Sequence, residues 1–258
     1  MKAFWIFLLA GPLLAHDLYL LPERFRVEPG ASFLLSVCVG DSFPVSEGPA
    51  DPRRLIGARF SDGAEIDGWQ IVGASTHAVV RVNSKGSVYA GVGTKPRRIE
   101  LPAEKFAKYL AEEGLNHVAQ WRKENGEADK QASELYSKFA KTLLVSGVPS
   151  DGWKAVFGYP IEIVPERDPS ALRPGELLPI LLLYDGKPLA GAQVEAAWEG
   201  GSKVAGRTDR NGRLKVPLTT TGKWRLHAVT MRRSTQPDTA DWESYWASLT
   251  FEVTGDAR

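Results

Sequence analysis

Short apolar runs separated by turn residues fill the first part of the chain. Between Leu18 and Leu101 the runs are apolar or alternate between apolar and polar residues, and Gly, Pro, Asp and Asn separate them. Examples are FRVEPGASFLLSVCVG, AEIDGWQIVG, HAVVRVN and SVYAGVG. Runs of this kind, bounded by such residues, are typical of β-strands. The pattern predicts an N-terminal β-domain over residues 16–102.

A different pattern occupies the middle of the chain. The stretch PAEKFAKYLAEEG begins with a proline and ends with a glycine, as helices commonly do. Further along, Leu135, Phe139 and Leu143 follow one another at a spacing of four, which places them on one face of a helix. The sequence therefore predicts a helical insertion over residues 103–146, followed by a linker over residues 147–158.

The strand pattern returns, more regularly, in the last part of the chain. Seven apolar or alternating runs follow one another: YPIEIVP, LLPILLLYDG, QVEAAWE, KVAGRTD, RLKVPLT, GKWRLHAVTM and SYWASLTFEV. Turn sequences such as DGKP and DRNG lie between them. About seven short strands in about 95 residues are typical of an immunoglobulin-like β-sandwich, which we predict over residues 159–254. The Cys–Trp–Cys core of true immunoglobulin domains is missing, so the pattern indicates the architecture alone.

Residues 1–15 have the pattern of a secretory signal peptide. Lys2 gives a positive start, Ala3–Leu14 form an apolar core, and Ala15 is a small residue suited to a cleavage site. The apolar core is shorter than the roughly 20 residues that a membrane-spanning helix needs. We therefore predict a periplasmic or secreted mature chain that begins at His16 and has no stable membrane span after cleavage. An uncleaved anchor or a buried first strand is the alternative.

Composition narrows the function classes. The chain has 32 Lys and Arg residues against 31 Asp and Glu residues, so no basic excess indicates a nucleic-acid partner. The single cysteine, Cys38, excludes an internal disulfide, and its place in an apolar run predicts a buried, unreactive thiol. Serine-hydrolase, phosphate-loop and HExxH zinc motifs are missing from the sequence, so we predict that the protein is not an enzyme.

The histidines offer a candidate metal site. A chain that begins at His16 has a free amine, with a pKa near ~8, and this amine can bind a metal together with the imidazole Nδ1. A second imidazole completes a three-nitrogen site that suits a copper or nickel ion. His227 is the first candidate for that second imidazole, followed by His77 and then His117. The alternative is that His16 is a solvated terminus and the other histidines are structural.

The run DWESYWASLTFEV carries aromatic residues on both faces of a predicted strand. This pattern indicates a strand that packs against its own sheet on one side and another part of the protein on the other. Stacking of a carbohydrate on Trp242 and Trp246 is the alternative to core packing. Asp241 and Glu243 lie in the same run, and ion pairs with nearby arginines are the simplest role for them.

The motifs also resemble a known family in combination. They are AHDLYLLP after the predicted signal, KFAKYLAEEGL, ELYSKFAKTLL, YPIEIVPERDP, GKPLAGAQV with TDRNG, and DWESYWASLTFEV. Together they resemble the DUF4198 family of exported bacterial proteins, which is often labelled NikM-like or nickel-uptake-related. GKPLAGAQV with TDRNG also resembles carboxypeptidase-regulatory-like and Cna-B-like sandwiches. The resemblance implies export, a carboxypeptidase-regulatory-like β-sandwich at the C-terminus, and metal-transport components as partners.

Two function classes follow from these observations. The first is an exported metal-binding or metal-uptake accessory protein of the nickel or copper class, with an N-terminal histidine chelate. The second is a non-metal binding module or an adhesion-like β-sandwich without enzymatic activity. The first class predicts that His16 and a second histidine lie within a few ångströms of each other.

Overall fold

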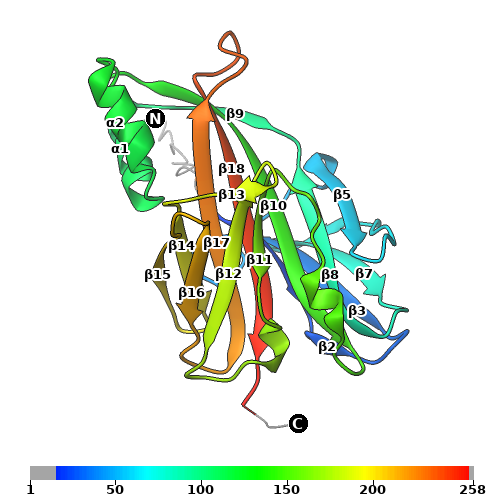
Figure 1. The fold of residues 1–258 in the computed structure, drawn as a ribbon. Helices are drawn as coiled ribbons and strands as arrows, with labels where there is room; N and C mark the ends of the chain where they lie inside the picture. The colour runs from blue at the N-terminus through cyan, green and yellow to red at the C-terminus, as the bar shows by residue number, and fades with distance from the viewer. Residues whose placement is uncertain (1–15, 256–258) are drawn as a thin grey trace, which may run out of the picture.

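The protein is mainly β, and its computed structural model describes residues 16–255 (Figure 1). The predicted signal peptide over residues 1–15 lies outside the described residues. The described part contains three β-sheets and two α-helices, α1 (Ala103–Glu112) and α2 (Asn116–Glu124). The predicted fold class, mainly β with a helical insertion, is therefore confirmed. Within the described residues, neither helix is long and apolar enough to cross a membrane.

A sheet of nine strands forms the central layer. Its main path runs in the order β15 (Gly201–Arg207), β14 (Gln193–Trp198), β17 (Gly222–Arg233), β18 (Trp242–Val253), β10 (Ala132–Ser146), β8 (Gly86–Thr94) and β5 (Leu55–Phe60). Two shorter strands, β2 (Arg26–Val27) and β9 (Arg97–Leu101), also pair with β10. Strands β10 and β18 run parallel, so β10 joins strands from the first half of the chain to strands from the second.

Two smaller sheets complete the β-structure. The first has the order β1 (Leu18–Pro22), β3 (Ser32–Val39), β7 (Ser75–Arg81) and β6 (Gln70–Val72), with β4 (Gly48–Pro49) beside β3. The second has the order β11 (Ile161–Pro165), β12 (Leu177–Tyr184) and β13 (Lys187–Pro188), with β16 (Arg213–Pro217) beside β12. Three short 3₁₀ helices connect strands: η1 (Pro52–Arg54), η2 (Asp151–Lys154) and η3 (Pro169–Ala171).

The central sheet carries a separate hydrophobic core on each face. Leu143 on β10 belongs to the core shared with β11, β12 and β16. Its neighbour Leu144 belongs to the core shared with β1, β3 and β7. Consecutive side chains of a strand point to opposite faces, so β10 contributes to both cores in alternation. The smaller sheets therefore cover opposite faces of the central sheet.

The C-terminal part has the strands that the sequence predicts. Each of the seven predicted runs forms a strand, namely β11, β12, β14, β15, β16, β17 and β18. Strands β14, β17 and β18 face β11, β12 and β16 across one core, in the manner of a β-sandwich. In this part the apolar pattern is local and period-two, which is why it predicts the strands well.

The predicted helical insertion over residues 103–146 is correct where α1 and α2 form and wrong for its last part. Residues 132–146 form the strand β10, not a helix. The prediction relied on Leu135, Phe139 and Leu143, but residues four apart share a face in a strand as well as in a helix. A strand covered on both faces also has a nearly continuous apolar sequence, which hides the alternation.

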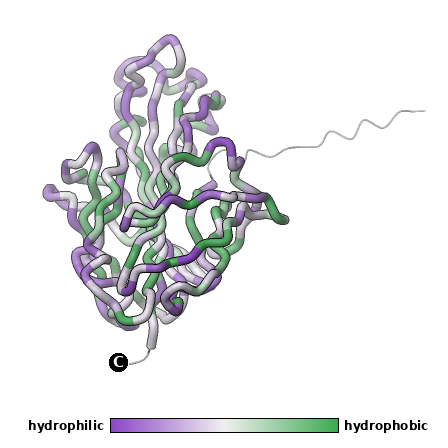
Figure 2. Tube along the Cα trace, turned by 90° about the vertical axis from the view of Figure 1, so that its right-hand side faces the viewer, coloured by the Kyte–Doolittle hydropathy of each residue, from purple (hydrophilic) through white to green (hydrophobic). Residues whose placement is uncertain are grey.

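Helices α1 and α2 lie against one end of the central sheet, at the upper left of Figure 1. Phe106, Tyr109 and Leu110 of α1 are buried in a third core together with Val229 of β17 and Trp246 of β18. The loop between β17 and β18, at the top of both views, is hydrophilic (Figure 2). The helices therefore cover the end of the sheet at which β17 and β18 carry buried polar side chains such as Thr230 and Ser244.

Candidate functional site

The residues that follow the predicted signal peptide lie inside the protein. Strand β1 pairs with β3 and rests on the central sheet. The hydroxyl of Ser248 donates a hydrogen bond to the carbonyl of Leu18 at 2.7 Å, and that of Thr250 donates to the carbonyl of Leu20 at 2.6 Å. Asp17, just before β1, is only 6% exposed. The start of the described chain is therefore held by the last strand, β18.

Asp17 is the centre of a buried charged network. Its carboxylate lies 2.7 Å from Nη2 of Arg225 and 2.9 Å from Nδ1 of His227, both on β17. All three side chains are buried. Burial raises the pKa of Asp17, but the charges of His227 and Arg225 outweigh it and hold the pKa at about 2. Asp17 is therefore ionised in the folded protein at neutral pH.

His227 uses both ring nitrogens within the protein. Nδ1 pairs with Asp17, and Nε2 lies 3.0 Å from a carboxylate oxygen of Glu113, which follows α1. Burial opposes its protonation, but these two carboxylates raise the pKa of His227 to about 10. A doubly protonated imidazole has no lone pair for a metal. The structure therefore places His227 in an ion-pair network, and it is not among the residues gathered around His16.

A buried lysine holds the backbone of His16. The ammonium group of Lys138 on β10 donates a hydrogen bond to the carbonyl oxygen of His16 and lies 4.2 Å from the ring centroid of Trp246. Burial lowers the pKa of Lys138. Within residues 16–255, no carboxylate oxygen lies within 4.0 Å of this ammonium group. The ammonium group of Lys138 therefore contacts the start of the described chain through a backbone carbonyl and not through an ion pair.

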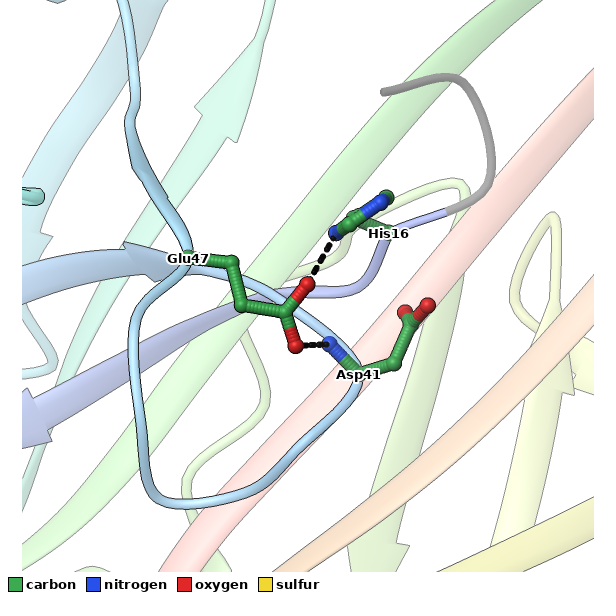
Figure 3. Close-up of side chains that lie close together, drawn as sticks. All are labelled: His16, Asp41 and Glu47. Atoms are coloured by element: carbon green, nitrogen blue, oxygen red, sulfur yellow. Dashed lines mark hydrogen bonds and ion pairs between the residues drawn. The ribbon is translucent and has the colours of Figure 1, made fainter. Parts of the chain in front are cut away.

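Three metal-ligating side chains meet beside that start (Figure 3). They are His16, Asp41 and Glu47, and one ligand atom from each lies within 4.8 Å of the others. Nδ1 of His16 is 2.9 Å from Oε2 of Glu47. Nδ1 is buried, and its angle to Glu47 does not satisfy a hydrogen bond, so it has no hydrogen-bond partner among the described residues. A donor atom of this kind is available to a cation.

The carboxylate of Glu47 is fixed by the backbone of its own loop. Oε1 accepts hydrogen bonds from the N–H groups of Asp41 at 3.2 Å and Ser42 at 3.1 Å, and Figure 3 shows the first of them. The hydrogen bond from Ser42 is the main cause of a lowered pKa for Glu47. Oε2 is left to face His16. The loop therefore orients an ionised carboxylate toward the imidazole.

Gly40 fixes this loop to the start of the chain. Its N–H donates a hydrogen bond to the carbonyl of Asp17 at 3.0 Å, and its carbonyl accepts one from Arg225 at 3.3 Å. A Cβ atom at this position would lie 2.9 Å from the carbonyl oxygen of Val45. Only glycine permits that approach. The loop that carries Asp41 is therefore anchored to the Asp17 network.

The other histidines lie in other environments. Nδ1 of His77 on β7 is 2.8 Å from the hydroxyl of Ser36 on β3, and Nε2 of His117 on α2 is 3.0 Å from the carbonyl of Met231. His77, the second candidate for a metal ligand, is not among the residues gathered around His16. The structure therefore places one of the three predicted metal ligands, His16, in a ligand cluster, and its companions there are carboxylates.

The tryptophans of β18 are buried. Trp246 stacks on Tyr109 with ring centroids 5.8 Å apart, and Trp242 meets Trp121 edge to face at 5.4 Å. Both tryptophans are 2–3% exposed. Glu243 of the same strand pairs with Arg232 at 2.8 Å. These aromatic residues pack the helices against the sheet, as the core-packing interpretation predicts.

Sequence comparison places the chain in a family. Residues 13–232 match DUF4198, a domain of unknown function. The chain belongs to the DUF4198 family. The match covers the His16 cluster, the Asp17 network and both helices. No functionally curated protein matches the chain.

The chain also has weak similarity to solved structures. It is similar to the Escherichia coli adhesin FdeC, with 14% identity and a TM-score of 0.24 over 93% of this chain and 65% of that one. It is similar to the Yersinia pseudotuberculosis adhesin InvE, with 11% identity and a TM-score of 0.21 over 95% of this chain and 64% of that one. The chain thus spans less than two thirds of each adhesin chain, and likenesses this weak indicate neither a shared fold nor a shared function.

Proposed function

We propose that this DUF4198 protein is an exported metal-binding accessory protein of the nickel or copper class, which binds one divalent cation through His16, Asp41 and Glu47. The observation that carries the proposal is the buried Nδ1 of His16, which faces a carboxylate at 2.9 Å without a hydrogen bond. Imidazole and carboxylate together suit first-row transition metals. Binding, rather than catalysis, is the role that these three side chains support.

The spacing of the donor atoms supports a cation. Two donor atoms that each lie about 2.1 Å from a metal, at a right angle, are about 3 Å apart. Nδ1 of His16 and Oε2 of Glu47 are 2.9 Å apart, and the ligand atom of Asp41 lies within 4.8 Å of both. A cation can therefore enter with small side-chain movements. The neighbouring charge of Asp17 is already neutralised by Arg225 and does not compete.

Processing after Ala15 adds a fourth donor to this proposal. A chain that begins at His16 has a free amine, which closes a chelate ring with Nδ1 of the same residue. Lys138 holds the carbonyl of His16, and Gly40 holds that of Asp17, so the backbone next to this amine is fixed. Two nitrogens and two carboxylate oxygens form a donor set that suits Cu(II) and Ni(II).

Calorimetric titration of Cu(II) and Ni(II) tests the proposal. The starting material is metal-stripped protein whose first residue is His16. We expect one cation per chain. Glu47→Gln and His16→Ala are each expected to weaken affinity more than about tenfold, because even residues outside the first ligand shell change metal affinity by that factor. One residue added ahead of His16 removes the amine chelate alone, and is expected to weaken binding while leaving some affinity.

Two variants serve as matched controls. His77→Ala removes a histidine outside the cluster, and Glu28→Gln removes an exposed carboxylate, so both are expected to bind the cation like the parent. Equal binding by Glu47→Gln and the parent would contradict the proposed ligand set. A parent protein that binds neither cation would instead favour a β-sandwich binding module without a metal.

A further inference from the structure

A cavity of about 150 Å³ lies next to the His16 cluster. His16 itself forms part of its wall, as do Arg54 of η1, Arg97 of β9 and Lys138 of β10. Tyr136 lies between two of these cations, with Arg54 5.4 Å and Lys138 5.3 Å from its ring centroid. Elements from four separate stretches of the chain thus bring three positive charges to one small space.

Among residues 16–255, none of these three cations forms an ion pair with a carboxylate within 4.0 Å. Arg54 donates a hydrogen bond to the carbonyl of Lys95 at 2.8 Å, and Lys138 donates to the carbonyl of His16. The acidic residue in the wall, Asp51, is already paired with Arg53 at 2.9 Å. The wall therefore holds three cationic side chains against one carboxylate. Lys138 is buried, Arg54 is half-buried and Arg97 is exposed at the mouth of the cavity, and three positive charges gathered in this way attract an anion.

The rest of the wall is apolar. Leu18, Val39 and Leu55 face the same cavity. Its volume corresponds to roughly five water molecules in liquid water, so it suits a molecule much smaller than a drug, whose pocket is about 300 Å³ or more. Apolar contacts beside three cations favour an organic anion with a short carbon chain over a bare inorganic ion.

We propose that this cavity binds a small organic dicarboxylate together with the cation at His16. One carboxylate of the ligand completes the coordination of the metal, and the other is bound by Arg54 and Arg97. His16 belongs to both sites, which links them physically. This proposal rests on the proposed cation site and adds its co-ligand: the protein takes the metal as a carboxylate complex.

The test uses malate as the probe and Cu(II) as the metal. The protein that begins at His16 is loaded with one equivalent of Cu(II), titrated with malate, followed by its visible absorption band, and then desalted. We expect the band to shift, and about one malate to stay with each copper-loaded chain. Inorganic phosphate, added in place of malate, is expected to cause no such shift.

Variants separate this inference from the cation site. Arg54→Gln with Arg97→Gln is expected to weaken malate binding about tenfold or more, because charge-assisted hydrogen bonds are lost. Copper binding without malate is expected to stay unchanged. Arg98→Gln is the control, since Arg98 lies on the same strand and pairs with Glu100.

Three results would overturn the inference. The first is copper binding with no response to malate, which leaves the cation site intact. The second is a response that persists in the double arginine variant. The third is an equal response to phosphate, which points to a general anion site. Loss of copper binding in the parent protein would instead remove the proposed function, and this inference with it.

Discussion

Nδ1 of His227 lies 2.9 Å from Oδ1 of Asp17, so a buried ion pair joins the start of the described chain to strand β17. The second ring nitrogen pairs with Glu113 at 3.0 Å, which extends the contact to the helices. One imidazolium thus connects the N-terminal sheet, the central sheet and the helical insertion. Its removal tests whether that connection stabilises the fold.

His227→Gln is expected to lower the free energy of unfolding by about 3 kcal/mol, since it leaves two carboxylates without their shared cation. The folded pKa of about 10 is above the ordinary value of 6.5. The stabilisation is therefore complete below pH 6.5 and is lost as the pH rises through 10. Urea unfolding at pH 6 and pH 10 measures it. His77→Gln is the control, and an equal loss in that variant would contradict the assignment.

Glu134 is expected to make the protein less stable as the pH rises. Burial raises its folded pKa from 4.5 to about 7, although Ser244 and Tyr109 donate hydrogen bonds to its carboxylate. Between these two values the folded state holds a proton that the unfolded chain has lost, so stability falls from pH 4.5 to pH 7. Glu134→Gln is expected to remove this fall. Thermal unfolding of both proteins at pH 4.5 and pH 8 checks it, and parallel pH profiles would refute it.

Gly40→Ala is expected to disturb the cation site without touching a ligand. The added Cβ would lie 2.9 Å from the carbonyl oxygen of Val45, so the loop must shift, at a cost of about 1–3 kcal/mol. The shift moves Asp41 and Glu47 away from His16, and Cu(II) affinity is expected to fall about tenfold. Val45→Ala is the control, because its side chain is exposed and its carbonyl is kept. Unchanged copper affinity in Gly40→Ala would show that the loop does not position the ligands.

Lys141 and Glu162 form a buried ion pair at 2.7 Å. Lys141 lies on the face of β10 opposite to that of Lys138. Glu162 also accepts hydrogen bonds from the backbone N–H groups of Phe157 and Gly158. Lys141→Met is expected to destabilise the fold by about 3 kcal/mol, because it leaves Glu162 buried without its cation. Copper affinity is expected to stay at the parent value. A stability loss below about 1 kcal/mol would mean that the pair behaves like an exposed one.

Local patterns in the sequence predict the strands of this protein better than they predict its site. The seven runs predicted in the C-terminal part are short and apolar or alternating, and each forms a strand. Strand β10 is missed because Leu135 and Phe139 share a face in a helix and in a strand alike. The burial of β10 on both faces depends on two distant sheets, which no local pattern records.

Only one of the three residues of the candidate cation site is predicted from the sequence. His16 is identifiable because a histidine follows the predicted cleavage site, and the structure places it in a ligand cluster. Asp41 and Glu47 were not predicted, since the segment GDSFPVSEG has the composition of an ordinary turn. Two acidic residues that follow a buried strand are only a weak indication of a metal site. His227, predicted as a partner of His16, instead forms an ion pair with the next residue, Asp17.

The support of β1 by β18 also sets the order in which this protein can fold. The hydroxyls of Ser248 and Thr250 hold the carbonyls of Leu18 and Leu20, so these contacts of the first strand form only when the last strand is in place. During synthesis the N-terminal residues leave the ribosome long before their partners exist, and contacts this distant in sequence form slowly. The first described strand therefore cannot complete its contacts until translation is nearly finished, and until then the carbonyls of Leu18 and Leu20 lack these two hydrogen-bond donors.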